Sequence, residues 1–325
     1  MSNATLARLG VNNGVSDGSW EQDNALFLEV FSGEVMTTFE RANIFKELHR
    51  MRTITEGKSA NFPALGNMHA RYHEPGTAIL GSNNPKIGQR TINIDDLLIA
   101  DVVIYDLEDA KLHFEVRQEY SKGLGVALAK RFDQKIARLG YLAARSDGVT
   151  DDYDGGSVVI HPNAATDGAQ LAACIFTAAE LLDTKDVPEE DRNVIVKPAQ
   201  FYLLVQHKDL LNSDWGGRGA LATADLPLVA NIAVHKSNNL PNGQNITAAI
   251  PGENNDYTGD FTNSVALVMN RLAVGTVKLF DLAVQKSGAD FNIVYQGDMF
   301  VAKYAMGHGI LRPDSAVEIA TAEAP

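Results

Sequence analysis

The amino-acid sequence predicts an α+β fold, in which helices and strands occupy separate stretches of the chain. An apolar residue recurs every four positions from Leu112 to Ile136, and this spacing predicts a long helix over 109–145. Two β-branched stretches, 51–65 and 89–107, flank a segment rich in Gly, Pro and Asn, which is typical of a hairpin with an extended tip. From Ser264 onward, strand-like segments predominate.

The composition is that of a soluble globular protein: 45% of the 325 residues are hydrophobic and 21% are charged. This length suits roughly two domains. The net charge of -13 disfavours nucleic acid and anionic membranes as tightly bound partners. The single cysteine, Cys174, excludes an internal disulfide, and its apolar neighbours favour a buried side chain over a reactive thiol. Because no signal peptide or membrane helix is evident, we expect a cytoplasmic protein with no membrane partner.

The chain begins with a polar stretch and a first helix. Residues 1–23 are rich in Asn, Gly and Ser and predict a mobile arm. The segment "NALFLEVFSGEVMTTFERANIF" follows and predicts a helix over 24–45. We expect its apolar residues on two faces, with Leu26, Val30 and Phe31 on one and Val35, Phe39 and Ala42 on the other.

The predicted hairpin and the helix after it both point to partners outside the segment. A long two-stranded ribbon is marginal alone in water and exposes strand edges, so a neighbouring subunit could support it. The helix over 109–145 would be roughly 50 Å long, and its four-residue stripe drifts by about 40° per step. Either the helix meets different partners along its length, or it bends at Gly123 and Gly125.

The second half of the chain predicts two further helices, a polar loop and several strands. Helices are expected over 169–184 and 198–212, the latter with proline in its first turn, and a strand over 193–198 lies between them. Residues 146–157 read as a loop, and residues 242–263 are polar and rich in Gly and Asn. Strands are expected in "VANIAVHKSNNLP", "SVALVMN", "AVGTVKLFDLAV" and "ADFNIVYQGDMFVAKYAMG".

The short motifs that suggest nucleotide binding fail on spacing or context. The stretch "EGKSA" at 56–60 resembles the end of a phosphate-binding loop, but Arg52 stands where that motif needs glycine. The stretch "GLGVAL" at 123–128 lies inside a helical pattern rather than after a strand. We therefore expect no cofactor site.

The candidate metal and nucleophile motifs are similarly weak. The aspartates at 147, 151, 152 and 154 do not match the twelve-residue calcium loop, because Asn163 occupies its last position. His69 and His73 have ligand spacing alone, on a segment that is not convincingly helical. No nucleophile elbow is present. We expect no metal site and no catalytic residue.

A locally basic stretch admits two interpretations. It contains Arg41, Lys46, Arg50, Arg52 and Lys58, interleaved with glutamates. It is either a solvated or subunit-contacting face, or a strip that meets nucleic acid or an acidic partner. The segment "AKYAMGHGILRPDSAVEIA", at 302–320, raises a similar choice, because its glycine-flanked His308 suits either a catalytic loop or a bend between strands.

Five stretches, in the same order, resemble the major capsid proteins of short-tailed, podovirus-type (autographivirus-like) bacteriophages: "ALFLEVFSGEVMTTFERA", "GKSANFPALG", "LIADVVIYDLEDA", "NRLAVGTVKLFDLAV" and "AKYAMGHGILRPDSA". The resemblance implies the capsid-shell fold of tailed phages (Hong Kong phage type). It also implies a division into an N-terminal arm (1–52), an extended hairpin loop (53–105), a peripheral domain with a long spine helix (106–172 and 263–308) and an axial domain (173–262 and 309–325).

The resemblance also implies where the working residues lie. His308 becomes a packed residue at a crossover between domains, and the glycines beside it allow backbone angles that other residues resist. The hinge and crossover candidates are Gly123, Gly125, Gly307, Gly309 and Pro313. The candidates for contacts between subunits are Leu26, Phe27, Phe31, Lys58, Phe62, Tyr72, His73, Lys86, Trp215 and Arg218. A core role is the alternative for the aromatic residues among them.

The implied function is structural, with no cofactor. We expect the chain to self-assemble into hexamers and pentamers of an icosahedral shell around double-stranded DNA, which it contacts loosely and non-specifically. The implied partners are a scaffolding protein, a portal complex and, as an option left open, a decoration protein, with assembly in the bacterial host cytoplasm and expansion of a precursor shell on packaging. Two alternatives stay open: a nanocompartment shell of the same fold around cargo enzymes, and a soluble oligomeric enzyme with a loop-borne site at His308.

Overall fold

A computed structural model of the chain describes residues 25–65, 70–79, 87–105, 116–149, 154–207 and 228–323. The chain separates into two compact units. The first comprises Met1–Asn43, Leu97–Phe132 and Phe280–Ala305, and the second comprises Ile44–Asp96, Asp133–Leu279 and Met306–Pro325. The long elements α4 (Val116–Ala144), β12 (Val274–Lys286) and β13 (Gly297–Ile310) contribute residues to both units.

The first unit has an aromatic core between α2 (Ala25–Ala42) and β13. Phe31 of α2 stacks on Phe300 with ring centroids 4.4 Å apart, and Phe39 meets Tyr304 edge-on at 6.1 Å. Strand β4 (Leu98–Tyr105) pairs antiparallel with β13, from Tyr105 opposite Gly297 to Leu98 opposite Tyr304. The aromatic pairs hold α2 against the sheet.

The buried face of α2 differs from the predicted one. Phe31, Val35 and Phe39 are all buried, whereas Val30 is exposed. The prediction that Val30 shares the face of Phe31, with Val35 and Phe39 on another, was wrong. Around a helix, residues four apart differ by about 40° and adjacent residues differ by about 100°. Phe31, Val35 and Phe39 therefore share one face, and Val30 lies outside it.

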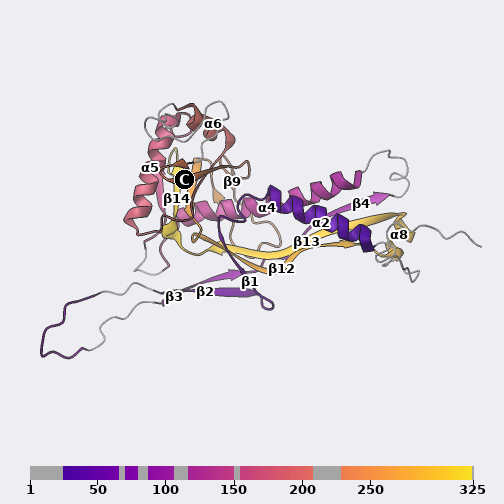
Figure 1. Ribbon diagram of the computed structural model, residues 1–325, viewed down its shortest axis with the longest axis horizontal. Coiled ribbons are helices and arrows are strands. Elements are labelled where there is room, and N and C mark those ends of the chain that lie inside the picture. The colour runs from indigo at the N-terminus through magenta and orange to yellow at the C-terminus, as the bar shows by residue number, and fades with distance from the viewer. Residues whose placement is uncertain are drawn as a thin grey trace, which may run out of the picture. The chain divides into compact units, whose positions relative to one another are not determined.

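The second unit is built on a six-stranded sheet with the strand order β5-β14-β11-β6-β8-β7. The helices α5 (Gly168–Thr184) and α6 (Pro198–Gln206) lie beside it (Figure 1). Residues of α5 and α6 form one buried cluster with Val194, Ala266 and Val268 of the sheet. The strands are β5 (Ser157–Ile160), β14 (Ala316–Ala320), β11 (Ser264–Asn270), β6 (Arg192–Val196), β8 (Ile232–Lys236) and β7 (Leu228–Val229).

Both faces of this sheet are covered at its centre. Every residue of β6, β11 and β14 is buried. Ala266 and Val268 face the helical cluster, whereas Leu267 meets α4, where a Cβ atom on Gly140 would lie 2.4 Å from its Cδ2. The "SVALVMN" segment is a strand, as predicted, but one without a solvent face.

A separate two-stranded ribbon also belongs to the second unit. Strands β2 (Ser59–Leu65) and β3 (Ile87–Asn93) pair antiparallel, from Ser59 opposite Asn93 to Leu65 opposite Ile87. The described part of their connection, 70–79, lies beyond the ends of both strands (Figure 1). The two strands confirm the predicted hairpin. β4, although it lies in the segment assigned to the hairpin loop, pairs with β13, and β1 (Arg50–Thr53) pairs in parallel with β12.

Helix α4 confirms the long helix, with 29 residues from Val116 to Ala144; 109–115 lie outside the described residues. It runs without interruption through Gly123 and Gly125. Leu124, Leu128 and Phe132 are buried in the first unit, and Ile136 and Tyr141 are buried in the second. The apolar residues at four-residue spacing, which shift gradually around the helix, are thus buried in different surroundings along the length of α4.

One further prediction needs correction. "ADFNIVY" forms the helix α8 (Ala289–Tyr295) rather than a strand. The polar segment over 242–263 contains two short paired strands, β9 (Asn245–Ile246) and β10 (Gly259–Asp260). Among the described residues, no helix is long and apolar enough to cross a membrane.

Candidate functional site

The outer part of the β2–β3 ribbon presents apolar side chains to solvent. Tyr72 is fully exposed, and Ile79 and Ile87 are each more than 70% exposed (76% and 72%). His73 beside Tyr72 is exposed as well. Exposed apolar side chains occur elsewhere in the described chain too, but these lie on a two-stranded element, which is marginal alone in water and gains from a partner that covers it. This outer part of the ribbon is therefore a candidate contact surface.

The inner end of the ribbon is fixed to the second unit. Ile92 and Ala60, opposite one another in the ribbon, are buried. The backbone N–H of Asn93 donates to Oδ1 of Asn255 at 3.1 Å, and Nδ2 of Asn255 donates to the Asn93 carbonyl at 2.7 Å. The ribbon thus has a fixed root, which we define as residues 92–96, and an exposed outer part.

Asp95 is the centre of the root. Its Oδ2 accepts from Nζ of Lys135 at 2.9 Å and from the hydroxyl of Tyr257 at 2.6 Å. Its Oδ1 accepts from the backbone N–H of Asn254 at 2.9 Å and from Nδ2 of Asn255 at 3.0 Å. The carboxylate has four donors in a buried setting, so its charge is compensated.

Lys135 links helix α4 to this network. Its Nζ lies 3.6 Å from Oε1 of Glu253 and 4.9 Å from the centroid of the Tyr257 ring. The side chains of both Lys135 and Glu253 are largely buried. Two carboxylates and an aromatic face thus hold one ammonium group, and the root cannot move away from α4 without exposing an unpaired buried charge.

His308 is sealed inside the second unit. It is 1% exposed, its Nδ1 lies 2.7 Å from Oγ1 of Thr276, and its backbone N–H donates to the Tyr257 hydroxyl at 3.2 Å. Burial, assisted by the positive charge of Lys135 and by His49, holds the pKa of His308 well below its usual value. It is a neutral packed residue, as predicted, and solvent does not reach it for chemistry.

The glycines beside His308 act by close approach rather than by unusual backbone angles. Both lie within β13, and neither is among the described glycines with a positive φ. A Cβ atom at Gly307 would lie 1.8 Å from the Asn93 carbonyl oxygen, and one at Gly309 would lie 2.7 Å from Cγ1 of Ile92. The predicted bend at these glycines was wrong. The chain turns after Ile310, through the 3-10 turn Pro313–Ser315.

The other predicted contact residues occupy varied places. Phe31 is a core residue, fully buried against Phe300, so its selection as a contact residue is corrected. Lys58 is exposed, and Phe62 is half-buried beneath the guanidinium of Arg52 at 5.6 Å. Leu26 and Phe27 lie in α2, but their side chains are not described; Lys86, Trp215 and Arg218 lie outside the described residues.

Of the remaining candidate motifs, Cys174, Asp147 and Asp154 lie among the described residues. Cys174 is buried, and burial raises the pKa of its thiol, which suits an inert side chain. Asp151, Asp152 and His69 lie outside the described residues. Within the described part of the chain, no group of three His, Cys, Asp or Glu side chains could hold a metal ion.

Comparison with known proteins agrees with this architecture. A family model described as Gp10A-like major capsid protein matches residues 61–320. The chain is 32% identical to the major capsid protein of Escherichia phage T7 over 333 residues, which cover 95% of each chain.

Two solved structures are similar over most of the chain. The capsid structure of Cyanophage P-SCSP1u matches with a TM-score of 0.80 and 41% identity, covering 99% of this chain and 100% of that one. The mature capsid of bacteriophage PhiM1 matches with a TM-score of 0.70 and 18% identity, covering 87% and 88%, which shows a shared fold alone.

Proposed function

Because this chain belongs to the Gp10A-like family of major capsid proteins, we propose that its copies form the hexamers and pentamers of an icosahedral shell that encloses double-stranded DNA. The protein is a structural component of a tailed-phage virion and not an enzyme. Repeated contacts between copies perform its function, since a closed shell multiplies many contacts of modest strength.

The β2–β3 ribbon is the proposed arm of this contact. The observation that carries the proposal is the division of the ribbon into a fixed root and an outer part with exposed Tyr72, Ile79 and Ile87. A fixed root reduces the conformational entropy that the ribbon loses when it binds a neighbouring copy. Burial of the exposed apolar side chains against that copy stabilises the contact. Lys58, Phe62, His73 and Lys86 remain proposed contact residues of the same ribbon, and Leu26, Phe27, Trp215 and Arg218 remain so elsewhere.

The proposed domains follow the expected order, with one change. An arm over 1–52 and a hairpin loop over 53–105 precede a peripheral domain with α4 as its spine. β5 and β11 fall in ranges expected for the peripheral domain, yet both belong to the six-stranded sheet with β14. The proposed axial domain therefore includes them together with α5 and α6.

The other proposed partners are a scaffolding protein, a portal complex, the enclosed DNA and, optionally, a decoration protein. Assembly of a precursor shell would take place in the bacterial host cytoplasm, and packaging would expand it. The net charge of -13 supports loose contact with DNA, because a container that bound its cargo tightly would resist packaging.

Shortening the ribbon tests the proposed arm. Leu65 and Ile87 lie opposite one another, so residues 66–86 are replaced with Asn-Gly, whose two-residue turn joins paired strands. We expect a soluble subunit with an unchanged unfolding transition and no closed shells by electron microscopy. A second variant replaces 66–86 with a Gly/Ser segment of equal length. It removes the side chains but keeps the length of the segment, so comparison of the two variants separates these effects. Full-sized shells from the shortened variant would exclude the ribbon as the assembly arm.

A further inference from the structure

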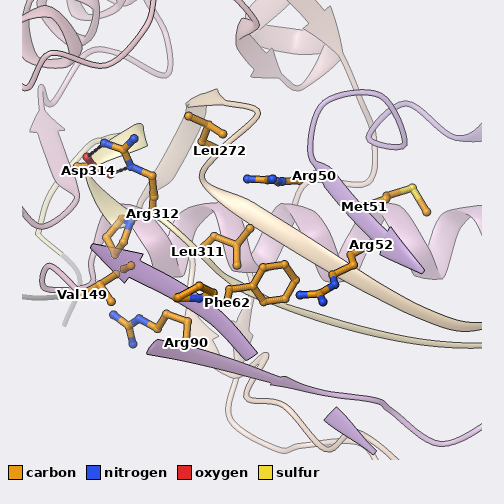
Figure 2. A pocket seen from close by; sticks show the side chains of 13 residues that line it. Arg50, Met51, Arg52, Phe62, Arg90, Val149, Leu272, Leu311, Arg312 and Asp314 are labelled. Atoms are coloured by element: carbon orange, nitrogen blue, oxygen red, sulfur yellow. Dashed lines mark hydrogen bonds and ion pairs between the residues drawn. The ribbon is translucent and has the colours of Figure 1, made fainter. Parts of the chain in front are cut away.

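A basic pocket of about 520 Å³ lies between β1, the ribbon and the segment after β13, all within the second unit. Figure 2 shows its lining. Four arginines contribute to it, Arg50 and Arg52 from β1, Arg90 from β3 and Arg312 from the last segment, whereas Asp314 is the one carboxylate among the described residues of the lining. Four positive charges and one negative charge give these described residues a net charge of +3, in a protein whose total charge is -13.

One of the four arginines is already neutralised. Nη2 of Arg312 lies 2.6 Å from Oδ2 of Asp314, and its Nε donates to Oδ1 at 3.3 Å. This bidentate pair uses the carboxylate that the described lining contains. The remaining three guanidinium groups carry the excess charge.

Two of those three, Arg52 and Arg90, have only weak partners among the described residues. Arg52 donates to the Asn61 carbonyl at 3.4 Å and lies over the Phe62 ring, and Arg90 donates to the Asp147 carbonyl at 3.4 Å. The Nε atom of Arg90 is buried without a hydrogen-bond partner there. No described carboxylate pairs with Arg50, Arg52 or Arg90. A buried donor without an acceptor is costly, so an acceptor from outside the described chain would be stabilising.

The pocket also has an apolar wall. Phe62, Leu311 and Leu272 contribute to the lining, and Figure 2 shows Phe62 and Leu311 between the arginines. A ligand that fills it therefore carries a carboxylate on an aliphatic stem, as Asp and Glu side chains do. A DNA duplex fits this shape poorly, because its phosphates are met by exposed basic strips, and Asp314 would repel them.

We propose that this pocket binds an acidic segment of a second copy of this chain in the assembled shell. The inference deepens the proposed function and rests on it. Charge complementarity supports this occupant, since the chain has 41 acidic residues against 28 Lys and Arg. Arginine is favoured at such contacts because its planar guanidinium meets a carboxylate with two hydrogen bonds. Two interpretations of the basic stretch are possible. For Arg50 and Arg52, the pocket supports the one in which the stretch meets an acidic partner.

Chemical cross-linking tests the occupant directly. Arg52→Lys and Arg90→Lys keep the positive charge and add an amine, which a carbodiimide joins to a touching carboxylate as an amide. Subunits labelled with heavy nitrogen are mixed with unlabelled ones before assembly, and the cross-linked peptides of the closed shells are identified by mass spectrometry. Arg131→Lys, at an exposed position of α4, is the matched control.

The outcomes separate this inference from the proposed function. We expect light–heavy cross-links at positions 52 and 90 that exceed those at 131 by at least tenfold. Closed shells without light–heavy cross-links at 52 and 90 would overturn the pocket proposal and leave shell assembly intact. Failure of the wild-type chain to form shells would instead count against the proposed function.

Charge reversal provides the functional readout. Arg52→Glu combined with Arg90→Glu should lower the yield of closed shells at least tenfold at equal protein concentration, whereas Arg131→Glu should leave it unchanged. The thermal unfolding of the isolated subunits shows that each variant is folded, and the cross-linking result decides the matter if the double variant is not. Normal yields of empty shells with reduced retention of DNA would assign the pocket to nucleic acid and contradict the proposal.

Discussion

The ammonium group of Lys135 lies 2.9 Å from the carboxylate of Asp95, and both side chains are buried. Lys135 belongs to α4, and Asp95 follows the ribbon strand β3 by two residues. This ion pair therefore joins the long helix to the root of the element that we propose as the assembly arm. Its energetic importance can be tested by mutation.

Replacing Lys135 with Met should destabilise the subunit strongly. Removal of one partner from a buried pair leaves the Asp95 carboxylate uncompensated, which costs about 3–5 kcal/mol. Lys122→Met is the matched control, because its pair with Glu119 lies on an exposed part of the same helix and contributes at most about 1 kcal/mol. Denaturant unfolding of the two variants should differ clearly in midpoint. Equal midpoints would show that the root does not depend on this pair.

The stability of the subunit should depend on His49 as the pH falls. Burial lowers the pKa of His49 from 6.5 to about 4, against a hydrogen bond with the Phe45 carbonyl and with help from the charge of Arg271. Between those two values the unfolded chain binds the proton and the folded chain does not. The contribution of His49 is thus fully present above about pH 6.5 and is lost as the pH falls toward about 4, by about 3 kcal/mol in total.

A buried aspartate of the same unit acts in the opposite direction. Burial raises the pKa of Asp133 to about 6, despite its hydrogen bonds from Ile44, Phe45 and Asn239. The folded chain therefore binds that proton first, and the contribution of Asp133 grows as the pH falls from about 6 toward 3.8. Asp133 is present in both wild type and His49→Gln, so the difference between their unfolding free energies reports the contribution of His49.

Unfolding free energies at several pH values should therefore show a shallower loss on acidification for His49→Gln than for wild type. His73→Gln, in the exposed tip, should follow wild type. Parallel curves for all three proteins would mean that His49 titrates alike in both states.

Two glycines in α4 should respond oppositely to alanine. Gly123 has nothing within 4 Å of an added Cβ atom, so Gly123→Ala should stabilise the helix by about 0.5–1 kcal/mol. At Gly125 the same atom would lie 2.8 Å from the Val35 carbonyl oxygen and 3.0 Å from Cβ of Thr38, so Gly125→Ala should cost about 1–3 kcal/mol. Thermal unfolding compares them. Stabilisation by both changes would contradict the close packing of α2 on α4.

Gly307 should tolerate no side chain. An added Cβ atom would lie 1.8 Å from the Asn93 carbonyl oxygen at the ribbon root, and backbone cannot yield as a flexible side chain does. We expect Gly307→Ala to cost about 3 kcal/mol or more, or to prevent recovery of soluble protein. Gly288→Ala, with nothing within 4 Å of the added atom, should cost at most about 1 kcal/mol, because glycine is favoured over alanine at the N-cap of α8. A soluble Gly307→Ala protein with wild-type stability would refute this packing.

Elements with strong periodicity could be predicted from the sequence. The four-residue series revealed α4, and the Gly- and Pro-rich segment between two β-branched runs revealed the ribbon. "ADFNIVY" was mistaken for a strand because a short apolar run fits either period, and its C-terminal limit depends on Gln296 with a φ of 52°.

The contacts that fix the ribbon could not be predicted, because they join residues far apart in sequence. Asp95 and Lys135 are 40 positions apart, and Asp95 and Tyr257 are 162 apart. No linear pattern marks such partners. The basic pocket is similar: the local density of charge pointed to Arg50 and Arg52, but only the fold places Arg90 and Arg312 beside them.

The prediction for His308 was correct in outcome and wrong in detail. It packs and forms a hydrogen bond as expected, but its glycine neighbours allow two strands to approach rather than turn the chain. A pair of glycines is compatible with both roles, and only the position of the neighbouring backbone distinguishes them.

Electron microscopy of the full chain, expressed alone and with a candidate scaffolding protein, tests the central claim most directly. The account predicts closed shells, or tubes of capsomers, whose wall consists of this protein. Only dimers or tetramers, under both conditions and across salt concentrations, would contradict it.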